Sequence, residues 1–302
     1  MPNPASDTQL PDVQLRFLLP HAGVRGIHVR LEGAWREILS HAHYPPAAQQ
    51  LLGEASVAAA LFTGHVKVGG RLSLQLRAAG PLRTLFAECT AAHTLRGIVR
   101  WDDGAALTRD LTRLGDDAVL AITIENPGLD PREPQRYQSL VALRAPTLAE
   151  AFEDYFRQSE QLPTRLLLVA DGEAAAGLML QKLPGDAGDD DGWNRIGALF
   201  DTLGEAELLA TPAATLLQRL FHEEGFEVLA GQPLRFACSC SRERVAGMLR
   251  SLGRVEAEAA AIDGTAEVRC EFCGRRYLFS ETEIVELFAP APVQAQAPAH
   301  LQ

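Results

Sequence analysis

Four of the five cysteines in this chain lie near its C-terminal end and form two short pairs. Cys238-Ser-Cys240 is followed by 29 residues and then by Cys270-Glu-Phe-Cys273. Cysteines at positions i and i+2 of an extended segment point to the same side. Two such local pairs, brought together by the fold between them, form a tetrahedron of sulfurs that suits zinc. The pattern predicts that Cys238, Cys240, Cys270 and Cys273 bind one zinc ion per chain.

The second pair resembles a zinc knuckle, because Gly274 directly follows Cys273 and glycine permits the tight turn that a knuckle needs. Spacing alone leaves open whether the site is a permanent structural centre, as most four-cysteine zinc sites are, or also a switch. A C-x-C pair is less usual than a C-x-x-C pair, and each local pair can oxidise to a disulfide without a large rearrangement. This feature favours a switch.

The fifth cysteine, Cys89, lies in an apolar, strand-like segment. A buried structural thiol is therefore its expected role. In a reducing cytosol, the clustered cysteines are expected to be metal ligands or redox groups rather than structural disulfides.

Length and hydrophobic pattern predict about two domains dominated by strands. The chain has 302 residues, and a domain usually has roughly 150. An Ala/Leu-rich pattern between Pro46 and Phe62 predicts a buried helix. Thr147, with Glu150 three residues later, forms a capping box that opens an amphipathic helix reaching Gln161. Strands are expected at 13–19, 24–31, 72–78, 83–90, 96–101, 118–125, 138–144, 165–170 and 176–183.

An acidic, turn-rich stretch at 184–192 ends this pattern. Apolar stripes over 193–224 predict two or three short amphipathic helices, with Thr211 as an N-cap and Pro212 at the first helical position. Residues 184–230 contain two arginines and ten carboxylates, a net charge of −8, while the parts before and after carry −2 and −1. Short helices of this kind need a surface to pack on.

We therefore expect an α+β protein with an N-terminal mixed α/β core domain, a helical linker and a small C-terminal zinc-binding domain. The expected boundaries are 1–183 for the core domain, 184–231 for the acidic amphipathic linker and 232–289 for the four-cysteine domain. The Pro/Ala/Gln-rich end, 290–302, is expected to be disordered.

The charge of the chain disfavours a zinc-ribbon module that binds nucleic acid. The net charge is −11 overall, and the cysteine-rich end lacks the positive surface that phosphate neutralisation requires. No run of 18 apolar residues predicts a membrane span, and the N-terminus does not resemble a secretory signal, so a cytoplasmic location is expected.

A dithiol oxidoreductase is the second alternative. It would place the first cysteine of a C-x-x-C motif at a helix N-terminus, whereas Cys270-Glu-Phe-Cys273 precedes a strand-like segment, Arg-Arg-Tyr-Leu-Phe. The sequence also offers no nucleophile triad and no catalytic acid–base pair. We therefore expect a protein that is not an enzyme.

Several long segments together closely resemble the redox-regulated 33 kDa chaperonin family, the heat shock protein 33 type of bacterial holdase. The resemblance runs from about residue 13 to 288 and is strongest from residue 147 onward. The segments that carry it are TLAEAFEDYFRQSEQLPTR (147–165), AAGLMLQKLP (175–184), LLQRLFHEEGFEV (216–228), CSCSRERV (238–245) and CEFCGRRYLFS (270–280).

The resemblance implies an ATP-independent holdase that is inactive when reduced, with zinc held by the four thiolates. Oxidants would form the disulfides Cys238–Cys240 and Cys270–Cys273, release zinc, and unfold the zinc domain together with the linker. The exposed surface would then bind unfolding proteins and prevent their aggregation under oxidative stress. The linker of the family corresponds to about 184–231 of this chain.

Unfolding of the linker would expose apolar side chains that dense carboxylates keep soluble, which suits client capture. The expected client-binding residues are Phe200, Leu216, Leu217, Leu220 and Phe221. Expected partners are unfolding client proteins and, in the oxidised form, a second copy of the chain. Nucleic acid and membranes are not expected partners.

Overall fold

The computed structural model describes residues 11–289 except 67, 129, 131–132 and 186. Contacts divide the chain into two units, 1–238 and 239–302. The expected disordered end and the first ten residues lie outside the described residues. Each unit is described by itself below.

A five-stranded antiparallel sheet forms one layer of the first unit, in the order β10-β1-β2-β9-β8. Its strands are β1 (Val13–Leu19), β2 (Val24–Leu31), β8 (Thr164–Ala170), β9 (Ala175–Lys182) and β10 (Glu227–Pro233). Because side chains alternate along a strand, one face of this sheet packs on a long helix and the other on the helices of the acidic segment. Both faces are therefore covered.

A six-stranded sheet forms a second layer, in the order β11-β5-β4-β3-β6-β7. Its strands are β3 (Arg71–Arg77), β4 (Leu82–Thr90), β5 (Thr94–Trp101), β6 (Val119–Asn126), β7 (Gln135–Val141) and the short β11 (Arg235–Phe236). Helix α2 (Gly33–Ser40) and a 3₁₀ turn at Leu111–Arg113 complete this part. The pairing of β11 with β5 is parallel and the other pairings are antiparallel.

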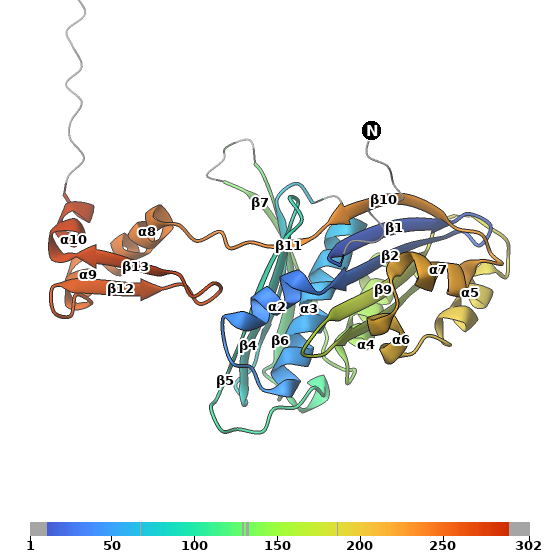
Figure 1. The fold of residues 1–302 in the computed structure, drawn as a ribbon, viewed down its shortest axis with the longest axis horizontal. Helices are drawn as coiled ribbons and strands as arrows, with labels where there is room; N and C mark the ends of the chain where they lie inside the picture. The colour runs from blue at the N-terminus through green and yellow to red at the C-terminus, as the bar shows by residue number, and fades with distance from the viewer. Residues whose placement is uncertain (1–10, 67, 129, 131–132, 186, 290–302) are drawn as a thin grey trace, which may run out of the picture. The chain divides into compact units, whose positions relative to one another are not determined.

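Helix α3 (Pro46–His65) packs against strands of both sheets, as Figure 1 shows. It begins at Pro46, and the missing N–H of proline is no disadvantage there because the first N–H groups of a helix have no acceptor within the helix. Nearly every residue from 51 to 63 is buried, because a helix between two sheets needs apolar residues on all sides. Small residues permit close approach: a Cβ on Gly53 would lie 2.3 Å from the Cβ of Ala170. The predicted buried helix is confirmed.

Helix α4 (Leu148–Tyr155) opens with the predicted capping box. Thr147 Oγ1 accepts from the backbone N–H of Glu150 at 3.2 Å, and the Glu150 carboxylate accepts from the backbone N–H of Thr147 at 3.3 Å. The helix does not continue regularly to Gln161, because a π-helical turn occupies Phe156–Glu160 and Gln161 adopts a left-handed conformation. Tyr155 and Phe156 are both buried.

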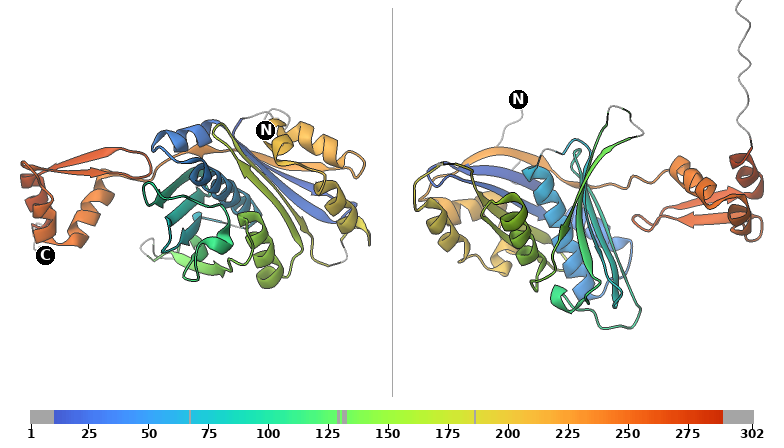
Figure 2. Two further views of the ribbon diagram at one scale, coloured as in Figure 1. Left: turned by 90° about the horizontal axis from the view of Figure 1, so that it is seen from below. Right: turned by 180° about the vertical axis from the view of Figure 1, so that it is seen from behind.

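Three short helices cover the outer face of the five-stranded sheet: α5 (Gly192–Phe200), α6 (Glu205–Ala210) and α7 (Ala213–Phe221) (Figure 2). The expectation of two or three helices over 193–224 is confirmed. Thr211 does not cap α7, however; it ends α6, and Pro212 takes the N-cap position with an extended backbone (φ −57°, ψ 144°). The φ that the proline ring fixes is compatible both with the N-cap position and with the first helical position of α7.

The second unit is a small α/β fold. Its elements are α8 (Arg242–Leu252), α9 (Arg254–Ala259), the antiparallel hairpin β12 (Thr265–Arg269) and β13 (Arg276–Ser280), and α10 (Glu281–Leu287). Its core is small and consists of Val245, Ala246, Leu249, Ala257, Ala266, Tyr277, Phe279 and Ile284. A fold with so little apolar surface gains from an additional cross-link such as a metal.

The fold class predicted from the sequence is confirmed: mixed α/β, with the cysteine cluster near its C-terminal end. Within the described residues, no helix combines the length and the apolar character needed to cross a membrane.

Candidate metal centre

The first cysteine pair lies in the extended segment between β11 and α8. The segment stays extended up to Ser241, which is the N-cap of α8 and whose Oγ accepts from the backbone N–H of Arg244. Cys238 and Cys240 therefore occupy alternate positions of a non-helical segment, as the C-x-C spacing predicts.

The second pair lies in the turn between β12 and β13. Cys270 N–H donates to the Arg275 carbonyl at 2.9 Å, and Gly274 N–H donates to the Cys270 carbonyl at 2.8 Å. Gly274 has φ +66°, a left-handed conformation that glycine adopts without strain. These bonds curl the chain so that both sulfurs of the pair lie on one side, as in a zinc knuckle.

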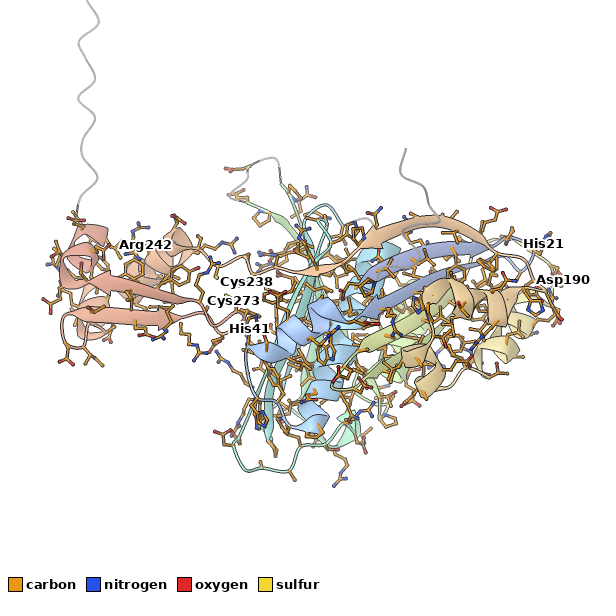
Figure 3. The ribbon with its side chains drawn as sticks, in the orientation of Figure 1. His21, His41, Asp190, Cys238, Arg242 and Cys273 are labelled. Atoms are coloured by element: carbon orange, nitrogen blue, oxygen red, sulfur yellow. The ribbon has the colours of Figure 1, made fainter. Side chains whose placement is uncertain are left out.

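The structure brings the four cysteines together. Their sulfurs all lie within 4.8 Å of one another, and Cys240 Sγ is 3.4 Å from Cys273 Sγ. A tetrahedral zinc site with Zn–S bonds of about 2.3 Å requires sulfurs about 3.8 Å apart. The observed spacing fits such a cage, and all four side chains are partly buried thiols. These residues could hold a metal ion, and four thiolates favour zinc. Figure 3 labels one cysteine from each pair.

Two neighbours of the cluster were not predicted from the sequence. The Tyr277 hydroxyl donates to Cys240 Sγ at 3.1 Å, and this hydrogen bond raises the pKa of Tyr277. Arg96 of β5, paired with Glu88 at 2.8 Å, also interacts with Cys238. The alternation of Tyr277 and Phe279 in β13, both buried, could have predicted that Tyr277 faces inward. Arg96 is distant in sequence, and no local signal identifies it.

The expected client-binding residues are buried in the structure. Phe200, Leu216, Leu217, Leu220 and Phe221 pack on Leu15, Phe17, Val24, Leu178 and Leu180 of the five-stranded sheet. The rings of Phe17 and Phe221 have centroids 6.0 Å apart. In this state these five side chains are therefore covered by the five-stranded sheet.

Within the acidic segment, Arg195 bonds Asp189 at 2.8 Å and Glu224 at 2.9 Å, and the hydrogen bond to Arg195 lowers the pKa of Asp189 to about 2. Polar contacts also join the segment to the five-stranded sheet: Arg165 of β8 pairs with Asp201 at 3.3 Å. Arg30 of β2 donates to the carbonyl of Leu209 in α6. Exposed ion pairs contribute only about 0–1 kcal/mol, so apolar packing is the main attachment.

Beneath these helices, His28 is fully buried on β2 with neither ring nitrogen hydrogen-bonded. Its strand partners Leu15 and Leu178 place it on the sheet face that α5–α7 cover. Burial, with a smaller effect of Arg30, lowers the pKa of His28 to about 3. The imidazole is therefore neutral while the helices are docked.

Cys89 lies apart from the metal centre, on β4, with no exposed surface. Burial raises the pKa of its thiol to about 12. The prediction of a buried thiol is confirmed.

Comparisons with known proteins identify the family of this chain. The sequence model described as "Hsp33 protein" matches residues 12–280. The 33 kDa chaperonins of Ectopseudomonas mendocina and Azotobacter vinelandii are 44% and 43% identical, covering 94% and 92% of this chain and 97% and 95% of theirs. The crystal structure of the Thermotoga maritima 33 kDa chaperonin (heat shock protein 33 homolog) superposes with a TM-score of 0.76 at 24% identity, over 92% of this chain and 98% of that one.

The chain belongs to the Hsp33 family. It is therefore a chaperone rather than an enzyme, and a chaperone binds unfolded client proteins.

Proposed function

We propose that this chaperone is an ATP-independent holdase switched by oxidation of the four-cysteine site. The reduced, zinc-bound form is inactive. Oxidation forms the disulfides Cys238–Cys240 and Cys270–Cys273, and zinc leaves because a disulfide sulfur is no longer a thiolate ligand. The observation that carries this proposal is the clustering of all four sulfurs within 4.8 Å as two local pairs.

The size of the second unit supports the coupling of zinc to folding. A structural zinc site supplies roughly 10 kcal/mol or more to a small fold, whereas whole domains have net stabilities of only about 5–15 kcal/mol. The apolar core of this unit is small. Loss of zinc should therefore unfold the second unit, which makes up most of the zinc domain proposed at 232–289.

The burial of the client-binding candidates supports residues 184–231 as the linker that opens. Its helices have six to nine residues each, too short to persist without packing. A net charge of −8 over 184–230 adds self-repulsion. Once undocked, these helices melt and expose both Phe200, Leu216, Leu217, Leu220 and Phe221 and the sheet face beneath them.

We also propose cytoplasmic action, where a reducing pool keeps the four thiols ready. Client proteins are the main partners, and a second copy of the chain is a partner of the oxidised form. Nucleic acid is not proposed as a partner, because the acidic chain repels phosphate.

Light scattering of a heat-unfolding client tests the proposal. Peroxide-treated protein should suppress aggregation, and reduced zinc-bound protein should not. Adding dithiothreitol and zinc should restore the inactive form. Equal suppression by both forms would instead identify the zinc as a permanent structural centre.

A further inference from the structure

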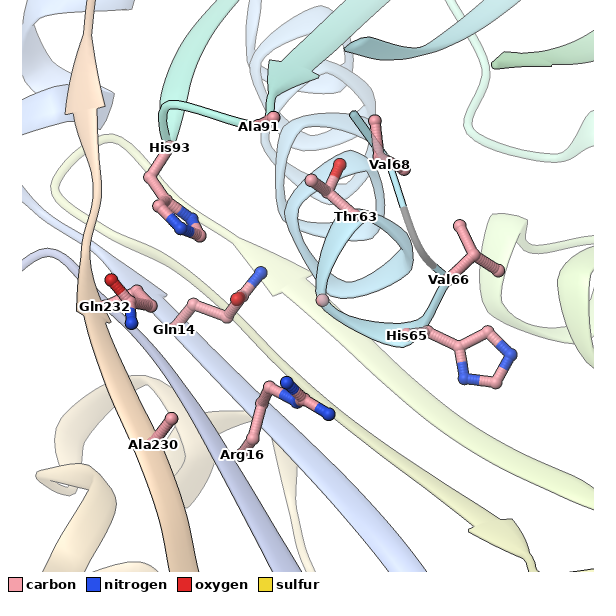
Figure 4. Close-up of a pocket in the computed structure, with 11 residues that line it drawn as sticks. Gln14, Arg16, Thr63, His65, Val66, Val68, Ala91, His93, Ala230 and Gln232 are labelled. Atoms are coloured by element: carbon pink, nitrogen blue, oxygen red, sulfur yellow. The ribbon is translucent and has the colours of Figure 1, made fainter. Parts of the chain in front are cut away.

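A polar hollow lies where the C-terminal end of α3 meets the edge of the five-stranded sheet. Its volume is about 450 Å³, within the range of roughly 300–1,000 Å³ typical of small-molecule sites. Figure 4 shows side chains around it that come from separate segments: Gln14 and Arg16 from β1, Gln232 from β10, and His93 from the turn between β4 and β5.

The strand register explains why these side chains converge. Gln14 pairs with Gln232, and Arg16 pairs with Ala230, so all four side chains lie on the face of the sheet toward α3. The alternate residues, such as Leu15, pack under the acidic helices. The small side chain of Ala230 leaves space beside Arg16.

The hollow is positively charged although the chain is acidic. No carboxylate is among the described residues that line it, whereas the guanidinium of Arg16 is. An adjoining hollow of about 150 Å³ shares Arg16 and His65 and adds Arg25. Burial is the largest cause that lowers the pKa of His65 to about 4, and the nearby charges of Arg25 and Arg16 add to this effect. Arg16 and Arg25 therefore lie close together here beside a neutral His65, with no carboxylate among the described residues that line either hollow.

His93 lines the hollow from the turn between β4 and β5. It adopts a left-handed backbone conformation (φ +57°), which is uncommon for residues other than glycine but is found in short hairpin turns. Its Nδ1 is buried without a hydrogen-bond partner, although buried polar atoms are normally paired. The turn is fixed in place because the His93 carbonyl accepts from the backbone N–H of Arg235 at 3.2 Å. Because Nδ1 is closed off from solvent, Nε2 is the ring nitrogen that can donate to a group bound in the hollow.

We propose that this hollow binds a phosphate-bearing small molecule through its phosphate group. The guanidinium of Arg16 matches a phosphate in geometry and charge, and His93 supplies a second donor. The Gln14 amide nitrogen already donates to the Ala60 carbonyl at 2.5 Å, and its second N–H, with the amide of Gln232, provides further donors. A tetrahedral oxyanion accepts hydrogen bonds from several directions, and the volume leaves room for the rest of the molecule.

The site also joins the core to the end of the linker. Gln232 lies on β10, directly after the acidic segment, so the complete site exists only while β10 is paired with β1. A bound ligand therefore stabilises that pairing through mass action. This consequence rests on the proposed linker switch, whereas binding itself does not.

Calorimetric titration of the full-length reduced protein tests the site, at ionic strength fixed with potassium chloride. Inorganic phosphate and ribose 5-phosphate are the probes, with ribose as the uncharged comparison. We expect saturable binding of a phosphate compound and none of ribose. Tighter binding of the sugar phosphate would identify a metabolite as the source, and equal affinity would identify the free anion.

Two variants locate the binding. Arg16→Gln should weaken it at least about tenfold, the loss expected from one charge-assisted hydrogen bond. His93→Asn should also weaken it while tolerating the left-handed backbone. Arg113→Gln, at an exposed arginine in the 3₁₀ turn, is the matched control and should bind like the parent. No saturable binding of either phosphate compound, or equal affinity in Arg16→Gln and the parent, would overturn the proposal.

Discussion

At the scale of single residues, differences in burial give the five cysteine thiols different reactivities. Cys89 is fully buried, and its pKa of about 12 keeps it a protonated, poorly nucleophilic thiol. The four clustered cysteines are only partly buried and lie beside one another. Oxidation should therefore discriminate sharply between the two kinds.

Cys89 should remain reduced while peroxide oxidises the other four cysteines. Alkylation after denaturation, followed by mass spectrometry, should find Cys89 as the modified thiol and the pairs Cys238–Cys240 and Cys270–Cys273 as disulfides. A Cys89→Ala variant should be activated by peroxide like the parent. Oxidation of Cys89 with the other four intact in active protein would contradict the mechanism.

His28 should make docking of the acidic helices sensitive to pH. Its pKa is about 3 when buried and 6.5 when exposed, so the proton binds preferentially to the opened state. Docking should be unaffected above pH 6.5 and should weaken as the pH falls from 6.5 toward 3, by about 1.4 kcal/mol per unit.

Urea unfolding of the reduced protein at pH 7.5 and 5.5 measures this effect. The loss of unfolding free energy between the two values should be about 1.4 kcal/mol smaller in His28→Leu than in the parent. His222→Leu, which removes an exposed histidine, should keep the parent's dependence. If His28→Leu shows the same loss as the parent, His28 does not couple docking to protons.

At the scale of elements, the β12–β13 turn and the extended segment before α8 each supply half of the metal centre. Neither half can bind zinc alone with four ligands, so removing one sulfur should affect the whole site. Cys238→Ser should remove most of the zinc from purified reduced protein, measured by metal analysis. Binding should also weaken as pH falls, because each cysteine thiol must lose its proton to become a thiolate ligand. Full zinc content without Cys240 or Cys273 would refute this assignment.

Helix α7 is the element whose packing should govern activation. Leu217 is fully buried against the sheet, and truncating such a leucine to alanine costs about 2–5 kcal/mol. Leu217→Ala should therefore suppress client aggregation in the reduced state, as measured by light scattering. Gln218→Ala changes an exposed neighbour on the same helix and should stay inactive until oxidised. If reduced Leu217→Ala protein has undocked helices but does not suppress client aggregation, opening of the linker alone does not create the client-binding surface.

At the scale of the whole molecule, oxidation should unfold the linker and leave the core intact. Hydrogen exchange after peroxide treatment should accelerate strongly over 193–230, while 13–183 stays protected by its sheets and α3. Reduced protein is the control. Protection of 193–230 in oxidised, client-binding protein would mean that the binding surface lies elsewhere.

Local signals determined much of this protein from sequence alone. Alternating apolar residues predicted β1, β2, β4 and β9, because the period of a strand is independent of what it pairs with. The capping box of α4 was also local, since both of its partners lie within one helical turn. The cysteine spacing predicted the ligand set, because sulfurs two or three residues apart can face one metal.

The tertiary structure decided what depends on distant partners. Strand β10 was not predicted, because it is a half-exposed edge strand without apolar alternation and forms only by pairing with β1. No local pattern reveals that His28 lies beneath α5–α7, or that Arg16, His93 and Gln232 surround one hollow. Burial and convergence arise from packing between segments far apart in the chain. Those features were therefore fixed by the assembled sheets rather than by any single stretch of sequence.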